Sequence, residues 1–244
     1  MSTFQNYVIL STRSLLNILS QICFTDCHID TMNSYSTGAK SEAKRIVWMD
    51  LEMTGLDINK DHILEIACLV TDADLNLIAT GPNIIIHQPD EILSNMNDWC
   101  VAQHGETGLT DASRKSKITV ADAEKQILKF VKSHVPEKKC PLGGNSVYMD
   151  RLFLRKYMPA LDAYLHYRII DVSTIKELAK RWYQKEFSNI PQKKFQHRCL
   201  KDIEESIAEL KYYKENIFNH VRTTIFFPIN LSNHIIHINH IKNY

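Results

Sequence analysis

Asp50 and Glu52 stand two positions apart at the end of a short apolar run. The run, residues 45–49, has the β-branched and aromatic composition of a strand. Side chains two apart on a strand point to the same face, so the two carboxylates would project together. Like charges this close raise each other's pKa unless a cation neutralises them. The pair suggests a cation site, although an Asp-x-Glu alone is more often a pair of solvated acids.

Asp150, His197 and Asp202 are the other candidates for the same chemistry. Asp150 follows the turn at residues 143–146, in the first turn of an expected helix, where an acid also interacts favourably with the helix dipole. His197 and Asp202 are five residues apart, which on one continuous helix separates their directions by about 140°. They can face one site only if His197 lies in the loop before the helix. Pro191 and the polar residues after it predict such a loop.

Together, these residues indicate metal-dependent cleavage of a phosphodiester bond. Four carboxylates on separate elements, without cationic partners nearby in the sequence, suit hard divalent cations such as Mg²⁺ and Mn²⁺. Two such ions about 3.5–4 Å apart can bind both the attacking and the leaving oxygen of a phosphodiester. A histidine, with an ordinary pKa of about 6.5, can accept the proton of the attacking water.

Four stretches of the sequence resemble the oligoribonuclease family, which belongs to the DEDDh branch of the 3′–5′ exonucleases and has a ribonuclease H-like fold. They are WMDLEMTGL at 48–56, GNSV-x-x-D at 144–150, HYRIIDVST at 166–174 and HR-x-x-x-DI at 197–203. The resemblance implies His197 as the general base. It also implies two divalent cations, whose ligands would be Asp50, Glu52, Asp150 and Asp202.

The resemblance further implies how the 3′ end of the substrate is held. Leu56 resembles the family's wedge against a base. Trp99 and His104 resemble groups that line the pocket of the 3′ nucleotide. For Trp99 a role in the core is the alternative, because aromatic side chains are usually buried there.

At the 5′ end, Ser146, Arg168 and Ser173 resemble the family's cap on the 5′ phosphate. In the family, Tyr167 and Arg168 are offered across a homodimer, so this chain is expected to form a homodimer. Core packing is the alternative for Tyr167. A closed cap would admit only oligonucleotides of a few residues. Short substrates also suit the balanced charge of the chain, with 29 Lys and Arg against 28 Asp and Glu.

Two residues depart from the family pattern. Lys201 stands where the family commonly has a second acid before the last ligand, and Cys199 stands where a small residue is usual. One residue corresponds to about 100° on a helix, so Lys201 is expected to point away from the site that Asp202 faces. We therefore expect Lys201 to have at most a small, tuning effect on the site.

The periodicity of the sequence predicts the elements that position these residues. Strands are expected at residues 45–50, 62–70, 75–87, 140–147 and 167–172. The first three, joined by short turns, favour an antiparallel meander. Helices are expected at about 92–99, 120–131, 149–157, 175–182 and 200–213. The order βββ-αα-β-α-β-α-α predicts one α/β domain whose mixed sheet has an antiparallel edge and flanking helices.

Local signals refine two of these helices. Thr174 and Glu177 are spaced as a capping box at the start of the helix that follows the last strand. The apolar stripe of that helix is predicted to be Ile175, Leu178, Ala179 and Trp182. Ile92, Met96 and Trp99 recur at helical spacing and are placed on one helix.

The composition is that of an ordinary globular chain, with 44% hydrophobic residues among 244. The formal net charge of +1 excludes the strongly basic class that coats long nucleic acid. No run of about 18 apolar residues exists, so no membrane span is expected. Six cysteines without a CxxC motif indicate reduced thiols in a reducing compartment.

Residues 1–43 and 219–244 differ from the exonuclease domain predicted at 44–218. The first segment has one arginine and no acid among its first 24 positions, and residues 8–22 could form an amphipathic helix. This leans toward a mitochondrial transit peptide, with a disordered leader as the alternative, so the expected location is mitochondrial, cytoplasmic or both. The tail has histidines at 234, 237 and 240, spaced as in a metal clip, but a biased tail without function is favoured.

The sequence therefore predicts a homodimeric 3′–5′ exoribonuclease that degrades short oligoribonucleotides to 5′-mononucleotides with two Mg²⁺ or Mn²⁺ ions. A DNA-directed or general 3′–5′ exonuclease of the same superfamily is the nearest alternative, and residues 166–168 with Ser173 argue against it. A catalytically silent RNA-binding protein is a third reading. It is disfavoured because none of the five expected catalytic and metal-binding residues is missing.

Overall fold

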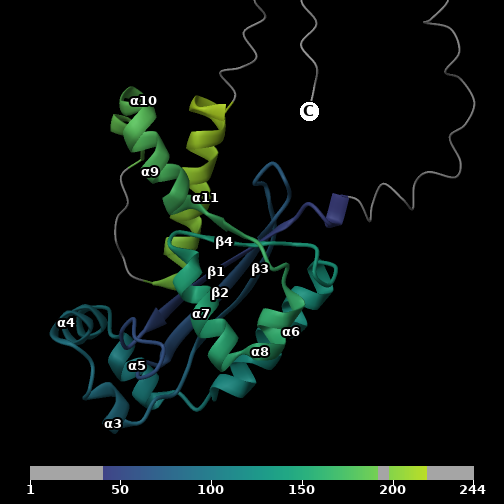
Figure 1. The fold of residues 1–244 in the computed structure, drawn as a ribbon. Helices are drawn as coiled ribbons and strands as arrows, with labels where there is room; N and C mark the ends of the chain where they lie inside the picture. The colour runs from purple at the N-terminus through teal and green to yellow at the C-terminus, as the bar shows by residue number, and fades with distance from the viewer. Residues whose placement is uncertain (1–40, 192–197, 219–244) are drawn as a thin grey trace, which may run out of the picture.

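The structure, a computed structural model, describes residues 41–191 and 198–218 (Figure 1). His197, the tail at 219–244 and nearly all of the predicted leader lie outside these residues. No helix of the described part is long and apolar enough to cross a membrane. Four cysteines are described, all of them free and buried, as expected for reduced thiols.

A five-stranded mixed sheet forms the centre of the fold, in the order β3-β2-β1-β4-β5. The strands β1 (Ile46–Met53), β2 (Ile63–Thr71) and β3 (Leu77–Ile85) pair antiparallel as the predicted meander. The strands β4 (Leu142–Gly144) and β5 (Ile169–Asp171) add in parallel beside β1. The predicted α/β fold with an antiparallel edge is confirmed.

Helices surround the sheet. They are α3 (Asp90–Leu93), α4 (Asp98–Glu106), α5 (Leu109–Lys115), α6 (Val120–His134), α7 (Val147–Tyr157), α8 (Pro159–Tyr164), α9 (Val172–Trp182), α10 (Gln184–Ser188) and α11 (Cys199–Asn216). In Figure 1, α9 and α11 lie together at the top and α6 and α8 at the lower right. The two groups cover different faces of the sheet.

The side chains of β1 alternate between these two faces. Val47, Met49 and Leu51 pack in a core with α6, α7 and α8. Ile46 and Trp48 pack in a second core with α9 and α11. Because strand side chains repeat every two residues, the next positions on the second face are those of the two acids at the end of β1. The two acids of β1 therefore lie on the face that α11 covers.

Strands β4 and β5 are shorter than predicted. A Cβ added to Gly144 would lie only 3.0 Å from the carbonyl oxygen of Met49, so the chain passes close to β1 there. Two residues later Ser146 has φ 52°, a left-handed conformation that ends the strand and starts α7 earlier than expected. At β5, Asp171 already caps the next helix and ends the strand.

The prediction of one helix through Ile92, Met96 and Trp99 is wrong. Asn97 has extended backbone, and its side chain accepts a hydrogen bond from the N–H of Cys100, so α3 and α4 are separate. Met96 is buried between them, whereas Trp99 is 61% exposed on α4. Asn97 is an N-cap residue, a type that favours starting a new helix over continuing one.

The predicted start of α9 is also wrong. Asp171, not Thr174, caps this helix by accepting a hydrogen bond from the Ser173 N–H at 3.0 Å. Of its predicted apolar stripe, Ala179 is buried, but Leu178 and Trp182 are exposed. The chain therefore buries one part of the predicted stripe, Ala179 and partly Ile175, and leaves Leu178 and Trp182 at the surface.

Candidate active site

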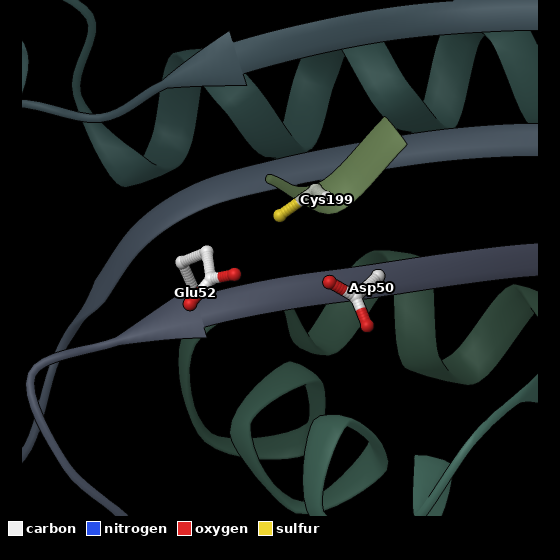
Figure 2. A group of neighbouring side chains, drawn as sticks. All are labelled: Asp50, Glu52 and Cys199. Atoms are coloured by element: carbon white, nitrogen blue, oxygen red, sulfur yellow. The ribbon is translucent and has the colours of Figure 1, made fainter. Parts of the chain in front are cut away.

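Asp50 and Glu52 project from the end of β1 toward the first turn of α11. One oxygen of each carboxylate and the sulfur of Cys199 all lie within 4.8 Å of one another. Figure 2 shows the sulfur directed from α11 toward the carboxylates of β1. The period-two spacing therefore gathers the first two predicted ligands as expected.

Asp150 reaches the same place from α7. Its Oδ1 accepts a hydrogen bond from the backbone N–H of Leu51 at 2.9 Å. The Val47 N–H, on the same edge of β1, donates to Pro141 at the start of β4. Since β4 ends at Gly144, the Leu51 N–H has no strand partner there, and the carboxylate of Asp150 takes that role. The Asp150 carboxylate is thereby held on the backbone of Leu51, the residue between Asp50 and Glu52 in the chain.

Asp202 lies in the first turn of α11. Its negative charge is close enough to raise the pKa of both Asp50 and Glu52. The Ser206 hydroxyl donates to the Asp202 carbonyl at 2.7 Å, one helical turn further on. The structure thus brings together all four predicted ligands, which we call the acid cluster: Asp50, Glu52, Asp150 and Asp202.

Burial and mutual repulsion disfavour ionisation of the acid cluster. Burial, followed by the charges of Asp150 and Glu52, raises the pKa of Asp50 well above its ordinary value. Burial, with the nearby charge of Asp202, raises the pKa of Glu52 to about 8. Burial raises the pKa of Asp150 to about 7. Such a set of hard oxygen donors fits divalent cations, whose charge would relieve the repulsion.

Arg198 and Glu65 form an ion pair beside the acid cluster that the sequence did not reveal. Glu65 is fully buried on β2, directly across from Glu52 in the register of the sheet. The Arg198 guanidinium donates to both of its oxygens, from Nη2 to Oε1 and from Nε to Oε2, each at 3.0 Å. A charged residue within the apolar strand β2 was the available signal, because a buried acid needs a partner.

This ion pair holds the beginning of α11 against the sheet. Arg198 immediately precedes the helix and immediately follows His197 in the chain. The predicted general base itself lies outside the described residues. Lys201, in the first turn of α11, is exposed, and its Nζ bonds to Glu204 at 2.8 Å. It is therefore turned away from the acid cluster, as predicted.

Leu56, Trp99 and His104 come together around one pocket. The pocket has a volume of about 410 Å³, within the usual range for small-ligand sites, and Glu52 is also part of its lining. Leu56 is 66% exposed and Trp99 61% exposed, so both are surface groups of the pocket and Trp99 is not a core residue. The predicted 3′ pocket residues therefore adjoin the acid cluster.

His104 forms the buried floor of this pocket. Its Nε2 lies 2.9 Å from the carbonyl oxygen of Met53, and its Nδ1 lies 4.0 Å from Oε2 of Glu52. The imidazole is held by the backbone at the end of β1. Its position connects the pocket to the acid cluster.

Ser146, immediately before α7, and Ser173, in the first turn of α9, also come together. The Ser146 N–H donates to Oγ of Ser173 at 2.9 Å and to Oδ1 of Asp171 at 3.0 Å, and the two hydroxyl oxygens are 3.1 Å apart. Tyr167 and Arg168 stand apart from this pair. Both are exposed, and the guanidinium carbon lies 5.3 Å from the centre of the Tyr167 ring.

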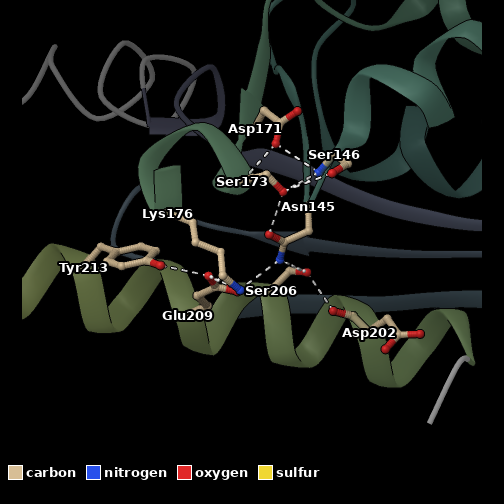
Figure 3. A network of polar contacts seen from close by, with 9 residues as sticks. All are labelled: Asn145, Ser146, Asp171, Ser173, Lys176, Asp202, Ser206, Glu209 and Tyr213. Carbon is tan, nitrogen blue, oxygen red and sulfur yellow. Dashed lines mark hydrogen bonds and ion pairs between the residues drawn. The ribbon is translucent and has the colours of Figure 1, made fainter. Parts of the chain in front are cut away.

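Asn145 links the serine pair to α11, as Figure 3 shows. Its Oδ1 accepts from Oγ of Ser173 at 3.1 Å, and its Nδ2 donates to Oγ of Ser206 at 2.8 Å. Nδ2 also contacts Oε2 of the buried Glu209 at 3.3 Å. The helix that carries Asp202 is thus connected by hydrogen bonds to the predicted 5′ phosphate residues.

Comparisons with known proteins show similarity to exonucleases. A family of exonucleases, RNase T, matches residues 47–210. The human mitochondrial oligoribonuclease is 58% identical over 179 residues, which are 73% of this chain and 76% of the human protein. A probable oligoribonuclease of Drosophila melanogaster is 56% identical over 71% of this chain and 82% of its own. The oligoribonuclease of Francisella tularensis is 51% identical over 72% of this chain and 98% of its own length.

Among solved structures, the chain is similar to exonuclease I from Methylocaldum szegediense. The TM-score is 0.56 at 16% sequence identity, over 72% of this chain. The match spans 41% of that exonuclease, so the chain corresponds to about two fifths of its length. The likeness concerns the fold, and it confirms the predicted ribonuclease H-like arrangement.

Proposed function

We propose how this chain, which belongs to the oligoribonuclease family of exonucleases, carries out the 3′–5′ degradation of short oligoribonucleotides. The observation that carries the proposal is the acid cluster, in which carboxylates from β1, α7 and α11 converge at one end of the sheet. Their raised pKa values are those of groups that need positive charge nearby.

The acid cluster holds two divalent cations, Mg²⁺ or Mn²⁺, consistent with a metal-dependent family. When bound, the cations supply positive charge to the oxygens of the scissile phosphodiester. Support comes from the donor set, which is rich in carboxylate oxygens and lies in a buried region. Asp150, fixed by the Leu51 N–H, needs no side-chain rearrangement to face the site.

His197 acts as the general base. It accepts a proton from the attacking water, whose oxygen bonds to phosphorus while the 3′ oxygen of the preceding nucleotide leaves. Each cycle therefore releases one 5′-mononucleotide. The position of Arg198, the next residue in the chain, supports this role, because its side chain binds Glu65, which pairs with Glu52 across the sheet. The chain directly after His197 is therefore held close to the acid cluster.

The two ends of the substrate bind on opposite sides of the acid cluster. The 3′ nucleotide occupies the pocket lined by Leu56, Trp99 and His104, whose exposed apolar groups suit stacking against a base. The 5′ phosphate is bound by Ser146 and Ser173, the hydroxyl pair that Asn145 links to α11. The span between these sites limits the length of the substrate.

A homodimer completes the 5′ site. Tyr167 and Arg168 are exposed in the single chain, as expected for groups that act on the site of a partner subunit. The exposed apolar side chains of α9, Leu178 and Trp182, provide a surface that association would bury. We place the protein in mitochondria, in the cytoplasm or in both, because the human and bovine relatives are named mitochondrial.

The purified full-length chain tests the proposal on a 5′-labelled RNA trinucleotide and its DNA counterpart. With Mg²⁺ or Mn²⁺, the RNA is expected to shorten one nucleotide at a time from its 3′ end, and a chelator should stop the reaction. Preferential cleavage of DNA would favour the general-exonuclease alternative. Binding of RNA without any cleavage in either metal would favour the silent RNA-binding protein.

A further inference from the structure

Cys199 places a sulfur atom among the carboxylates of the active site. It is the first residue of α11 and is completely buried. Its Sγ lies within 4.8 Å of one carboxylate oxygen of Asp50 and one of Glu52. Figure 2 shows the three side chains converging from two elements, β1 and α11. The thiol is part of the wall that a cation bound by Asp50 and Glu52 would touch.

The environment of Cys199 distinguishes it from the other described cysteines. Cys68 and Cys140 are buried in the core on the other face of the sheet, and Cys100 lies in a separate apolar cluster on α4, where it lines the same pocket as Glu52. Within the described ranges, the group of Asp50, Glu52 and Cys199 is the only set of three potential ligand residues whose donor atoms are this close. The sulfur atoms of Cys68, Cys100 and Cys140 belong to no such group of potential ligands in the described part of the chain.

The geometry of the three donors fits a single ion. Zinc binds thiolate sulfur at about 2.3 Å and carboxylate oxygen at about 2.0–2.2 Å. At a tetrahedral zinc ion, sulfur and oxygen donors at these bond lengths lie about 3.6 Å apart, so donor atoms already within 4.8 Å of one another have to approach by about 1 Å, which side-chain rotations can supply. Three protein ligands leave a further position open for water or substrate, as in many zinc sites.

Sulfur changes which cation the site prefers. Mg²⁺ binds oxygen donors and gains little from a thiol, whereas Zn²⁺, Co²⁺ and Cd²⁺ bind thiolates well. The negative charges of Asp150 and Asp202, which act on Asp50, add attraction for any dication. The sulfur of Cys199 is therefore the donor that makes the site prefer Zn²⁺, Co²⁺ or Cd²⁺ over Mg²⁺.

We propose that Asp50, Glu52 and Cys199 form a site for a thiophilic divalent cation, of which Zn²⁺ is the example. On binding, a bond forms between Sγ and the cation, and the thiol proton leaves to solvent. The ion occupies two carboxylates of the acid cluster and therefore competes with Mg²⁺ or Mn²⁺. The inference rests on the proposed function only in this competition; the binding itself does not require hydrolysis.

Cobalt provides a direct probe, because a Co²⁺–thiolate bond gives a near-ultraviolet charge-transfer absorption that oxygen and nitrogen ligands do not give. Co²⁺ is added to the metal-free full chain carrying Cys23→Ser and Cys27→Ser, which removes two cysteines that lie outside the described residues. We expect the band in this background and in a matched Cys68→Ala control. It should be absent from Cys199→Ser, and Zn²⁺ should bind that variant at least about tenfold more weakly, or about 1.4 kcal/mol.

An unchanged band and Zn²⁺ affinity in a folded Cys199→Ser variant would overturn the proposal. Circular dichroism checks folding. Should the variant not fold, ¹¹³Cd nuclear magnetic resonance of the Cys23→Ser, Cys27→Ser background chain decides instead, because one sulfur ligand shifts the cadmium signal strongly downfield from that of an all-oxygen site. A signal in the all-oxygen region would contradict the proposal. RNA cleavage with Mg²⁺ is measured separately, so failure of the proposed function is recognised by lost hydrolysis alongside an intact cobalt band.

Discussion

The Asp150 carboxylate accepts a hydrogen bond from the Leu51 N–H at 2.9 Å, across 99 positions of sequence. Leu51 stands between Asp50 and Glu52, so this single bond fixes the acid of α7 relative to both acids of β1. The bond satisfies a backbone donor that β4, ending at Gly144, leaves unpaired. Strand length and ligand placement are thus coupled in this fold.

Replacing Asp50 by Asn should reduce RNA hydrolysis at least about 100-fold, because a charged ligand is lost from the metal site. The metal-free protein should become more stable at neutral pH, since burial and repulsion disfavour the Asp50 charge. Steady-state kinetics and thermal unfolding in a chelator measure both effects. The exposed Glu106→Gln variant is the control, and near-normal turnover of Asp50→Asn would contradict the metal-ligand role.

The stability of the protein should depend on pH in a way that divalent cations reverse. The pKa of Glu52 is raised to about 8 and that of Asp150 to about 7, mainly by burial, so both exceed their unfolded values. A raised pKa means that stability is greatest at low pH and is lost as pH rises through the folded value. In a chelator the Tm should fall between about pH 5 and pH 8, and Mg²⁺ should restore it mainly at the higher pH. If Mg²⁺ raised the Tm by the same amount at about pH 5 and at about pH 8, the predicted role of Glu52 and Asp150 would be wrong.

His197→Ala should slow hydrolysis by about 10²–10⁴-fold while metal affinity is largely retained, as for loss of a general base. Raising the pH should partly restore the rate, because hydroxide replaces the missing base. Calorimetric titration with Mn²⁺ checks the affinity. Outright loss of Mn²⁺ binding would instead make His197 a ligand.

Glu65→Gln should destabilise the protein by about 1–3 kcal/mol, because it weakens charge-assisted hydrogen bonds with the half-exposed Arg198. Turnover should fall as well, since the beginning of α11 loses its attachment to β2. Denaturant unfolding and kcat measure the two effects. Lys214→Gln, which removes an exposed ion pair with Asp74, should do neither.

The sequence predicts those parts of the site that depend on local periodicity. The shared direction of Asp50 and Glu52 follows from the strand period alone, and the helix predicted at about 200–213 places Asp202 near its start. The bond from Leu51 to Asp150 could not be predicted, because it depends on the position at which β4 stops. That position depends in turn on the left-handed backbone of Ser146, which ends the strand and starts α7.

Features that depend on tertiary contacts were missed or misplaced. The pairing of Glu65 with Arg198 joins residues 133 positions apart, and no local pattern connects them. Thr174 matches the capping-box pattern, but Asp171 takes the cap because it lies at the end of β5, beside Ser146. Trp99 follows helical spacing, yet Asn97 starts a new helix and turns the indole outward.

The dependence of kcat/KM on RNA length tests the central claim that one site binds both ends of a short substrate. The pocket at Trp99 and the serine pair at Ser146 and Ser173 lie in the same domain as the acid cluster. A long strand has to leave past the 5′ site, and a net charge of +1 offers its backbone little attraction.

The measurement uses RNA of two, five and about twenty nucleotides, with wild type and Arg168→Ala. We predict a steep fall of kcat/KM with length in the wild type. In Arg168→Ala, the loss should be largest on the shortest RNA with a 5′ phosphate, and Lys201→Gln should serve as an unaffected control because Lys201 faces Glu204. Equal kcat/KM at all three lengths in the wild type would contradict the account.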